Sequence, residues 1–237
     1  MEIKNNEKLI SIIIPVFNEE KTLNQIINKV EKVPLKKEII VVDDGSTDNS
    51  RKIILELEKQ GRIKAVFSEK NQGKGSAIKL GIKNASGDIM IIQDADLEYD
   101  PMEIPIVVEP IIKEETDVCY GSRILKKENN WSTIFFYIGG RFVSLITSIL
   151  FFKKVTDEPT CYKAFKSSLV KNLELESNGF ELEPELTAKL FRLGCRYKEV
   201  PISYYSRKPI EGKKLKGIDG LKAVWTLLKW RFLPIKK

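Results

Sequence analysis

The 237-residue sequence contains no histidine. This absence excludes Ser-His-Asp and Cys-His nucleophilic machinery, imidazole general bases and histidine-ligated zinc. Cysteine is scarce too. Cys119, Cys161 and Cys195 lie far apart and form no Cys-x-x-Cys pair, so neither a zinc knuckle nor a redox dithiol is supported. We expect a reducing cytosol as the compartment, and residues 1–8 are polar, without the apolar core of a signal peptide.

Two common nucleotide-binding signatures are also missing. No Gly-x-Gly-x-x-Gly follows a predicted strand and no Walker motif occurs, which argues against a dinucleotide-binding fold and a P-loop enzyme. Repeats and low-complexity linkers are absent as well. With 42% hydrophobic and 31% charged residues, the chain has the composition of a globular protein, and its length fits one large domain or two small ones.

Excess positive charge is missing from most of the chain. The net charge is +7, but ten Lys or Arg and only two acidic residues, a local +8, fall between Arg207 and Lys237. The remainder is therefore close to neutral. A basic segment of this kind is attracted to phosphates, anionic lipid or nucleic acid.

Short apolar runs alternate with segments of helical periodicity. The runs predict buried strands at residues 9–16, 38–42, 63–67, 88–93 and 117–122. The periodic segments predict helices at residues 23–33, 50–58 and 76–84, with Asn18 as the N-cap of the first. Uninterrupted apolar strands alternating with helices indicate an α/β fold with a mostly parallel sheet covered by helices on both faces.

Polar residues follow three of these strands: Phe17-Asn18-Glu19, Asp43-Asp44-Gly45-Ser46 and Asp94-Ala95-Asp96. Ligands of open α/β sheets bind in the crevice outside the carboxyl ends of the strands, so the three segments predict one site. Asp94 and Asp96 are two residues apart in an extended segment and point the same way, which suits a cation that prefers oxygen ligands, Mg²⁺ or Mn²⁺. The alternative is a solvated acidic turn.

Four motifs taken together resemble the family 2 inverting glycosyltransferases of the GT-A fold: Ile14-Pro15-Val16-Phe17-Asn18-Glu19, Val42-Asp43-Asp44-Gly45-Ser46-Thr47-Asp48, Asn71-Gln72-Gly73-Lys74-Gly75 and Asp94-Ala95-Asp96. Three further pieces are similar to the branch of dolichol-phosphate mannosyltransferases and polyprenyl-phosphate glycosyltransferases: residues 94–101, Gly121-Ser122-Arg123 and Glu211-Gly212-Lys213-Lys214-Leu215. The resemblance covers nearly the whole chain. It departs at Glu98, where that family often has Gln or Ser.

The resemblance implies a nucleotide-sugar site and a metal ion. The residues that would bind the nucleotide sugar are Pro15, Phe17, Asn18, Glu19, Asp43, Asp44, Gly45, Gly73, Lys74, Gly75, Asp94 and Ala95. In this arrangement Asp43 and Asp44 meet the base and ribose, while Gly73 and Gly75 let the backbone approach the nucleotide. An ordinary turn, and a loop with a solvated lysine, are the alternatives. The ligands of the Mg²⁺ or Mn²⁺ that neutralises the diphosphate leaving group would be Asp94, Asp96 and Glu98.

The acceptor requires cations rather than a base if it is a lipid phosphate. A phosphate monoester is largely ionised at pH 7, so the enzyme has only to position it beside an anionic donor. The candidates for contact with the acceptor phosphate are Arg123, Arg207 and Lys213. Of these, Arg123 and Arg207 join Asp94 and Asp96 as the expected catalytic residues.

Two apolar stretches point to a membrane surface. Residues 134–152 approach the ~20 residues that span hydrocarbon, but polar residues recur at helical spacing and Gly139-Gly140 weakens a continuous helix. We therefore expect an interfacial or re-entrant segment, with an amphipathic core helix as the alternative. Near the end, Trp225 lies on an apolar helical face, and Trp225 and Trp230 together with Lys236 and Lys237 suit a membrane interface or a membrane-protein partner.

The sequence thus predicts a single glycosyltransferase domain over residues 1–237. Residues 1–102 form the half that binds the nucleotide sugar, residues 103–206 the acceptor half, and residues 207–237 a basic, amphipathic tail that faces the membrane. The expected reaction transfers a hexose, with inversion, from a GDP-mannose or UDP-glucose type of donor to a polyprenyl or dolichyl phosphate. We expect a peripheral enzyme on the cytoplasmic face of the membrane.

Two alternatives stay open. One is a glycosyltransferase that acts on a saccharide hydroxyl in polysaccharide synthesis, with a base from Asp157-Glu158 or Glu181-x-Glu183. The other is a non-catalytic module that binds lipid or anions. Nucleic acid is not an expected partner, because an acidic rim repels a polyanion that lacks a metal.

Overall fold

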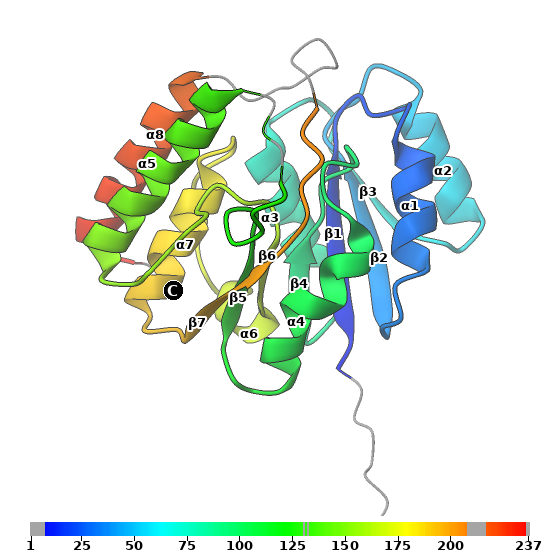
Figure 1. The fold of residues 1–237 in the computed structure, drawn as a ribbon. Coiled ribbons are helices and arrows are strands. Elements are labelled where there is room, and N and C mark those ends of the chain that lie inside the picture. The colour runs from blue at the N-terminus through cyan, green and yellow to red at the C-terminus, as the bar shows by residue number, and fades with distance from the viewer. Residues whose placement is uncertain (1–7, 130, 132, 208–216, 236–237) are drawn as a thin grey trace, which may run out of the picture.

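A computed structural model describes residues 8–129, 131, 133–207 and 217–235. Its centre is one seven-stranded sheet of order β3-β2-β1-β4-β6-β5-β7 (Figure 1). The strands are β1 Ile10–Val16, β2 Lys37–Asp43, β3 Lys64–Phe67, β4 Ile89–Ile92, β5 Val118–Ser122, β6 Lys163–Lys166 and β7 Tyr197–Pro201. Only β6 runs antiparallel to its neighbours, β4 and β5, among the described strands. The predicted α/β fold with a mostly parallel sheet is confirmed, but the antiparallel strand was not predicted.

The strands form because their apolar residues are buried on both faces of the sheet. Ile12, Ile13 and Ile14 in succession are fully buried, as a parallel sheet covered on both sides requires. The covering helices lie in front of and behind the sheet (Figure 1). The helices are α1 Leu23–Glu31, α2 Ser50–Lys59, α3 Lys74–Asn84, the 3₁₀ turn η1 Pro101–Glu103, α4 Ile104–Ile112, α5 Ile134–Phe151, α6 Ser167–Val170, α7 Leu182–Arg192 and α8 Gly217–Phe232.

The start of α1 differs from the prediction. Asn18 is not its N-cap, because α1 begins after Thr22. Instead Asn18 adopts a left-handed backbone conformation, and its side-chain oxygen accepts a hydrogen bond of 2.8 Å from the backbone N–H of Thr47. Asn tolerates this conformation better than most residues. Asn18 therefore joins the turns that follow β1 and β2.

α5 and α8 pack side by side on α7, at the edge of the molecule (Figure 1). A separate apolar cluster, which includes Val143, Phe191, Leu227 and Trp230, holds the three helices together. The glycine pair Gly139-Gly140 does not interrupt α5, which continues through it. A helix packed along its length by two neighbours tolerates the intrinsic weakness of glycine, since tertiary contacts supply most helical stability.

The polar stripe of α5 faces the protein and its apolar stripe faces outward. The Ser144 hydroxyl accepts a hydrogen bond of 2.9 Å from the backbone N–H of Glu158, and the Ser148 hydroxyl accepts one of 3.0 Å from Val155. The outward residues are more than half exposed: Ile134, Phe135, Ile138, Phe142, Leu145 and Ile149. This orientation is the reverse of an amphipathic core helix. By length and composition alone, α5 is also long and apolar enough to cross a membrane.

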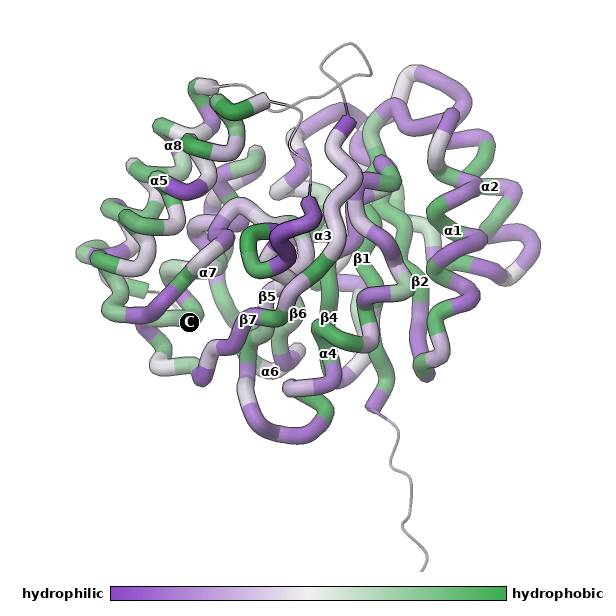
Figure 2. The backbone as a smooth tube through the Cα atoms, viewed as in Figure 1, coloured by the Kyte–Doolittle hydropathy of each residue, from purple (hydrophilic) through white to green (hydrophobic). Residues whose placement is uncertain are grey.

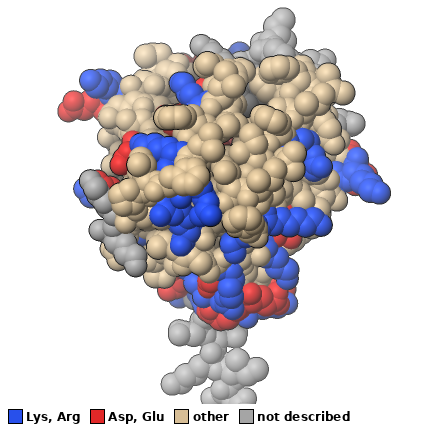
Figure 3. Space-filling model, turned by 90° about the vertical axis from the view of Figure 1, so that its left-hand side faces the viewer, with Lys and Arg blue, Asp and Glu red and all other residues tan. Residues whose placement is uncertain are grey.

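α8 extends the same outward surface. Leu221, Trp225 and Phe232 are 68%, 68% and 75% exposed. Figure 2 shows the hydrophobic colouring of α5 and α8 on this side of the molecule, and Figure 3 shows a broad uncharged surface there with a group of basic side chains within it. The exposed apolar residues of α5 and α8 are called the apolar face below. Contiguous apolar surfaces of this extent usually mark a binding surface.

Candidate functional site

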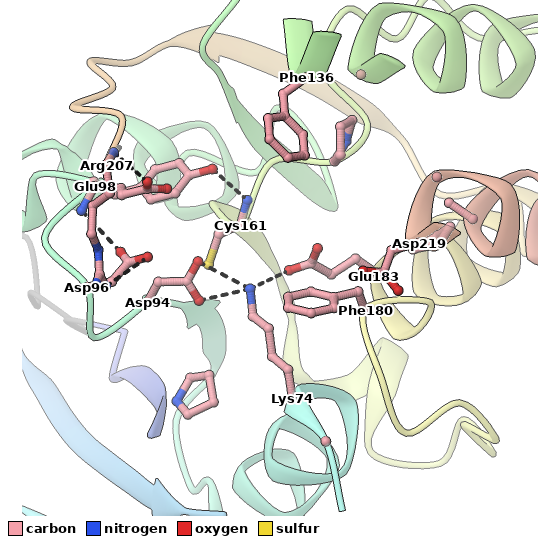
Figure 4. A pocket seen from close by; sticks show the side chains of 18 of the residues that line it. Lys74, Asp94, Asp96, Glu98, Phe136, Cys161, Phe180, Glu183, Arg207 and Asp219 are labelled. Atoms are coloured by element: carbon pink, nitrogen blue, oxygen red, sulfur yellow. Dashed lines mark hydrogen bonds and ion pairs between the residues drawn. The ribbon is translucent and has the colours of Figure 1, made fainter. Parts of the chain in front are cut away.

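A cavity of about 670 Å³ opens at the carboxyl ends of β1, β2 and β4 and reaches the N-terminal ends of α5 and α8. Figure 4 shows its central side chains pointing toward one another. The residues predicted for the site that line the cavity are Pro15, Phe17, Glu19, Asp44, Gly73, Lys74, Asp94, Ala95, Asp96, Glu98, Arg123 and Arg207. Residues from both predicted halves of the chain therefore meet in one cavity. Its position at the carboxyl ends of parallel strands is the usual one for ligand sites in open α/β sheets.

Asp44 lines this cavity and organises the loop before α3. Its carboxylate accepts hydrogen bonds from the backbone N–H groups of Gln72, at 3.0 Å, and Gly73, at 2.8 Å. Burial raises the pKa of Asp44 above its ordinary value, partly offset by these hydrogen bonds and reinforced by the neighbouring charge of Asp43. Asp44 therefore joins β2 to the glycine-containing loop and places a buried carboxylate at the cavity wall.

Asp43 has a structural position instead. It is fully buried, and its carboxylate accepts hydrogen bonds from Arg51 Nε at 2.8 Å and from the backbone N–H of Ser46 at 3.0 Å. Together with Asn18, Gly45 and Gly75, it does not line the cavity. The alternation of side chains along a strand explains the difference, because successive residues point to opposite sides.

The glycines after β3 allow two backbones to approach each other. A Cβ atom at Gly73 would lie 2.5 Å from the carbonyl oxygen of Asn178, and one at Gly75 would lie 2.7 Å from that of Gly179. The Ser76 N–H also donates to the Asn178 carbonyl, at 2.9 Å. Gly75 therefore serves contact with the loop before α7, rather than the close approach to a nucleotide that was predicted for it.

Lys74 lies at the centre of the cavity, which rules out the alternative of a solvated loop lysine. Its Nζ is 2.8 Å from Asp94 Oδ1 and 3.1 Å from Glu183 Oε1, and it approaches the ring of Phe180 (Figure 4). Burial by itself lowers the pKa of Lys74, but the charges of Asp94 and Glu183 outweigh it and hold that pKa well above its ordinary value. The ammonium group thus bridges two carboxylates from different elements.

Asp96 and Glu98 are joined by Arg207. The guanidinium of Arg207 contacts Asp96 Oδ2 and Glu19 Oε2, both at 3.2 Å. Glu98 accepts hydrogen bonds from the Arg207 backbone N–H at 2.7 Å and from the Tyr204 hydroxyl at 2.9 Å. Glu98 therefore fixes the segment that carries Arg207. Lys213, the third predicted phosphate contact, lies outside the described residues.

The carboxylates fit a divalent ion in part. Within the described chain, no three His, Cys, Asp or Glu side chains are gathered as a metal site, so Glu98 does not stand with Asp94 and Asp96 as a ready ligand. Asp94 and Asp96 each have a cation beside them, Lys74 and Arg207. Two carboxylates at a cavity wall suit Mg²⁺ or Mn²⁺, which commonly completes its shell with water and substrate phosphate.

Arg123 is the third cationic side chain that lines the cavity, after Lys74 and Arg207. It is 8% exposed, and its guanidinium donates to both oxygens of Asp157, at 2.7 and 2.8 Å. The rings of Tyr99, Trp131 and Tyr204 surround it at 4.9–5.9 Å. Burial lowers the pKa of Arg123, but Asp157 more than compensates, and the pKa lies well above its ordinary value. The arginine is held rigidly in its charged form.

The sequence did not identify several cavity residues. Aromatic side chains supply much of its wall, namely Tyr99, Trp131, Phe136, Phe180 and Tyr204. They come from loops and helix ends, where no periodic pattern marks them. Only the aromatic residues that flank the acidic motifs, such as Tyr99 three residues after Asp96, could have been found by proximity in the sequence.

Comparison with known proteins identifies relatives of the whole chain. The model of glycosyl transferase family 2 matches residues 11–173. The chain is 32% identical to a dolichol-phosphate mannosyltransferase of Pyrococcus furiosus over 93% of its length, but it spans only 64% of that relative. It is 34% identical to a UDP-N-acetylglucosamine–dolichyl-phosphate N-acetylglucosaminyltransferase of Methanococcus voltae, covering 83% of this chain and 85% of the relative.

Solved structures show the same fold. Glucosyl-3-phosphoglycerate synthase from Mycobacterium tuberculosis, in complex with Mn²⁺, uridine diphosphate and phosphoglyceric acid, matches with a TM-score of 0.75 over 97% of this chain and 81% of that one. The sequence identity is 22%. At this identity the likeness concerns the fold alone.

Proposed function

Because the chain belongs to glycosyltransferase family 2, we propose that it transfers a hexose, with inversion, from a nucleotide sugar to the phosphate of a polyprenyl or dolichyl phosphate. One observation carries the choice of acceptor. The cavity that holds the acidic residues of the predicted donor site also holds Arg123 and Arg207, and it ends between α5 and α8 beneath the apolar face. A phosphate with an isoprenoid chain matches both parts of that arrangement.

The donor half of the proposal uses the strand ends. Phe17, Asp44, Asp94 and Asp96 all line the cavity. Phe17 and Asp44 would contact the nucleoside, and Asp94 and Asp96 would lie at the diphosphate. These two carboxylates would hold Mg²⁺ or Mn²⁺, which would neutralise the charge that develops on the diphosphate as it leaves. Lys74 contributes a second positive charge beside Asp94. The choice between a GDP-mannose and a UDP-glucose type of donor rests with experiment.

The acceptor half uses preorganised cations. Two N–H groups of Arg123 bond to Asp157, and a guanidinium has five in all, so others remain for a phosphate. Arg207 lies beside Asp96, where the leaving group would be neutralised. An acceptor phosphate between Arg123 and Arg207 would attack as an anion, with no proton to remove. Inversion follows if it attacks the face opposite to the diphosphate.

The membrane location is part of the proposal. We assign the apolar face to the bilayer surface, on the cytoplasmic side, with residues 103–206 as the acceptor half and residues 207–237 as the basic tail. Arg231 supports this assignment, since it lies against Phe151 and Phe152 at the border of the apolar face. A cation beside an exposed aromatic residue, as Arg231 is beside Phe152, is typical of surfaces that meet lipid headgroups.

A saccharide hydroxyl is the alternative acceptor, and one observation favours it. Such an acceptor needs a base, and burial raises the pKa of Glu183, although Lys74 opposes the effect. A raised carboxyl pKa is suited to proton transfer near neutral pH. Two other predicted bases already accept hydrogen bonds. Asp157 accepts from the Arg123 guanidinium, and Glu181 accepts one of 3.1 Å from the Gly179 N–H.

A transfer panel tests the proposal. Radiolabelled UDP-glucose, UDP-N-acetylglucosamine and GDP-mannose are each incubated with polyprenyl phosphate, Mg²⁺ and the purified full chain. We expect label from one donor to enter the organic phase as an acid-labile lipid phosphate sugar. A matched incubation with polyprenol, which lacks the phosphate, should give no product. Label that enters no lipid but is transferred to an oligosaccharide supplied in a parallel incubation would favour the hydroxyl acceptor.

A further inference from the structure

Tyr204 contacts both arginines that line the cavity, one directly and one through a carboxylate. Its ring packs against the guanidinium of Arg123, whose Cζ atom lies 4.9 Å from the ring centroid. Its hydroxyl donates a hydrogen bond of 2.9 Å to Oε2 of Glu98. Oε1 of the same carboxylate accepts a hydrogen bond of 2.7 Å from the backbone N–H of Arg207. One side chain, from the segment after β7, therefore joins the surroundings of the two cations.

The protein fixes Tyr204 through its ring and its backbone. The ring centroid lies 5.3 Å from that of Trp131 and 5.6 Å from that of Tyr99. The backbone N–H donates to Asn129 Oδ1 at 2.8 Å, and the Asn129 amide donates in turn to the carbonyl oxygen of Arg123 at 2.7 Å. Because Tyr204 is also 5% exposed, its hydroxyl has a fixed place before any ligand binds.

Glu98 uses both of its carboxylate oxygens in the link between Tyr204 and Arg207. Hydrogen bonds to an ionised acceptor are roughly twice as strong as those between neutral groups. The Glu98 carbonyl oxygen accepts a further hydrogen bond of 2.9 Å from the Tyr205 N–H. The segment after β7 is thus attached to Glu98 at three points. Without the Tyr204 hydroxyl, Oε2 of a buried carboxylate would lose the donor that it has here, which is unfavourable.

The position of Arg207 depends on this attachment. Its guanidinium contacts Glu19 and Asp96 at 3.2 Å, whereas its backbone N–H contacts Glu98 at 2.7 Å. Among the contacts of Arg207 within the described residues, the one to Glu98 is therefore the shortest. Arg123 differs, because Asp157 holds its guanidinium directly.

The geometry points to Tyr204 as a positioning residue, which sets the separation of the Arg123 and Arg207 guanidinium groups on either side of the acceptor phosphate. The inference rests on the proposed function, in which that phosphate lies between the two arginines. Asp157 fixes one arginine, and the Tyr204–Glu98 pair fixes the other relative to it. A displacement of reacting groups by about 1 Å can cost about 100-fold in rate, so the separation of the two cations governs the attack on the sugar.

Tyr204→Phe tests the inference, because it removes the hydroxyl and keeps the ring beside Arg123. The full chain is assayed with a short, soluble prenyl phosphate and the donor found by the transfer panel. We expect kcat to fall about 10- to 100-fold through misplacement of Arg207. The acceptor KM should stay within about threefold, because Arg123 still binds the phosphate.

The same substitution in the Arg207→Ala background separates positioning from a general structural effect. There Tyr204→Phe should change kcat by less than about twofold, because the arginine that it positions is absent and the two effects are not additive. A substitution that merely loosened the fold would lower kcat in both backgrounds.

A spectroscopic readout needs no transfer at all. The Nε–H signals of the arginines are recorded by ¹⁵N NMR, and those of Arg123 and Arg207 are assigned by their loss in Arg123→Lys and Arg207→Lys. In Tyr204→Phe the Arg207 signal should broaden as its side chain becomes mobile. The Arg123 signal should stay sharp, because its Nε–H donates to Asp157 at 2.7 Å.

The matched control is Tyr120→Phe. Tyr120 is a fully buried tyrosine whose ring centroid lies 4.0 Å from Lys163 Nζ and whose hydroxyl is 2.7 Å from that of Thr187, but it does not line the cavity. It should lower the melting temperature and leave kcat and both arginine signals unchanged. If Tyr204→Phe does not fold, Glu98→Ala takes its place in the same measurements, since it removes the link from the carboxylate side.

Three results would overturn the inference: an unchanged kcat, an equal fall of kcat in the Arg207→Ala background, or an unchanged Arg207 signal. If the transfer panel gives no lipid product while the Arg207 signal responds to Tyr204→Phe, the lipid acceptor is wrong and the positioning of Arg207 stands. If lipid product forms while neither kcat nor the signal responds, the reaction stands and the role of Tyr204 is wrong.

Discussion

Asp157 fixes Arg123 in one orientation through two parallel hydrogen bonds of 2.7 and 2.8 Å, inside a ring of Tyr99, Trp131 and Tyr204. Asp157 also accepts a hydrogen bond of 2.9 Å from the Arg123 backbone N–H. The guanidinium is held at two points by a carboxylate that the backbone fixes at a third, so it loses little further freedom when a phosphate binds. Asp157 was one of the predicted alternative bases, but its carboxylate accepts hydrogen bonds from Arg123 and positions that side chain instead.

Asp157→Asn should therefore impair the acceptor step. The neutral Asn amide has one acceptor oxygen in place of the two carboxylate oxygens, so it cannot accept both hydrogen bonds from the guanidinium. Arg123 therefore loses its fixed position. We expect kcat/KM for the lipid phosphate to fall about 10- to 100-fold, corresponding to the loss of a charged hydrogen bond. Nucleotide affinity should be unchanged. Because a broken buried ion pair is destabilising by about 3–5 kcal/mol, activity is compared below the melting temperature of the variant, and unchanged kinetics there would contradict the role.

Asp96→Asn tests the metal assignment. The substitution removes a negative charge that Arg207 contacts at 3.2 Å, and the side chain is partly exposed, so the fold should persist. We expect transfer to fall by more than about 100-fold, since charge stabilisation by a metal amounts to several kcal/mol. Isothermal titration of Mn²⁺ in the presence of the nucleoside diphosphate should show weaker metal binding. Full transfer activity in this variant, or in excess chelator, removes Asp96 from the mechanism.

Asp44→Ala should act on donor binding more than on the saturated rate. A contact with base or ribose is present in both ground and transition states, so its loss raises KM. The expected increase is about 10- to 100-fold, measured with the donor identified by the transfer panel. A collapse of kcat at unchanged KM would place Asp44 at the reacting centre instead.

The pH dependence of donor binding gives a second test of Asp44. Its folded pKa is raised, chiefly by burial, so it takes up a proton at a higher pH than an exposed aspartate. Donor affinity should therefore be full above the raised pKa and decline as the pH falls through it. The isosteric Asp44→Asn variant lacks this titration, so its affinity should be low and flat over the same range. Identical pH profiles for both proteins would exclude Asp44 as the titrating group.

The first half of the fold was predictable because its signals are local. Strands such as β1 and β2 are continuous apolar runs, and each ends in a polar turn. β6 lacks such a signal. Its sequence, Lys163-Ala164-Phe165-Lys166, is short and begins and ends with lysine, and its identity as an antiparallel strand comes from pairing with β4 and β5. Strand pairing of this kind cannot be predicted from the hydrophobic periodicity of the sequence.

α7 was missed for a related reason. Glu183, Glu185 and Lys189 resemble a solvated face in the sequence, yet all three are buried. They are stable inside because each finds a partner of opposite charge, Lys74 for Glu183 and Lys189 for Glu185. The site was predictable at the strand ends, where Asp44 and Asp94 lie. Glu183 was named from the sequence only as an alternative base, and its ion pair with Lys74 was not predictable, because the two residues meet only through the fold.

The apolar face should bind membranes, and its residues should be separable from the catalytic arginines. Trp225→Ser and Phe142→Ser replace side chains that are 68% and 57% exposed, so their effect on stability should be within about 0.5 kcal/mol. Each should reduce flotation with anionic vesicles and slow transfer to membrane-embedded polyprenyl phosphate. Neither should slow transfer to a short, soluble prenyl phosphate. Leu55→Ser on α2, at 50% exposure, is the control and should change none of these measurements.

Arg207→Ala should show the opposite pattern. Arg207 lines the cavity and contacts Asp96 and Glu19, so its loss should slow transfer to the short acceptor and the membrane acceptor alike, with flotation unchanged. Salt separates the two surfaces further. Attraction of the basic tail to lipid is screened over roughly 8 Å at physiological ionic strength, so added salt should release the protein from anionic vesicles. The buried contact between Arg207 and the acceptor phosphate should persist at the same salt concentration. If the wild type does not float with anionic vesicles at low salt, the membrane assignment fails and the saccharide hydroxyl becomes the favoured acceptor.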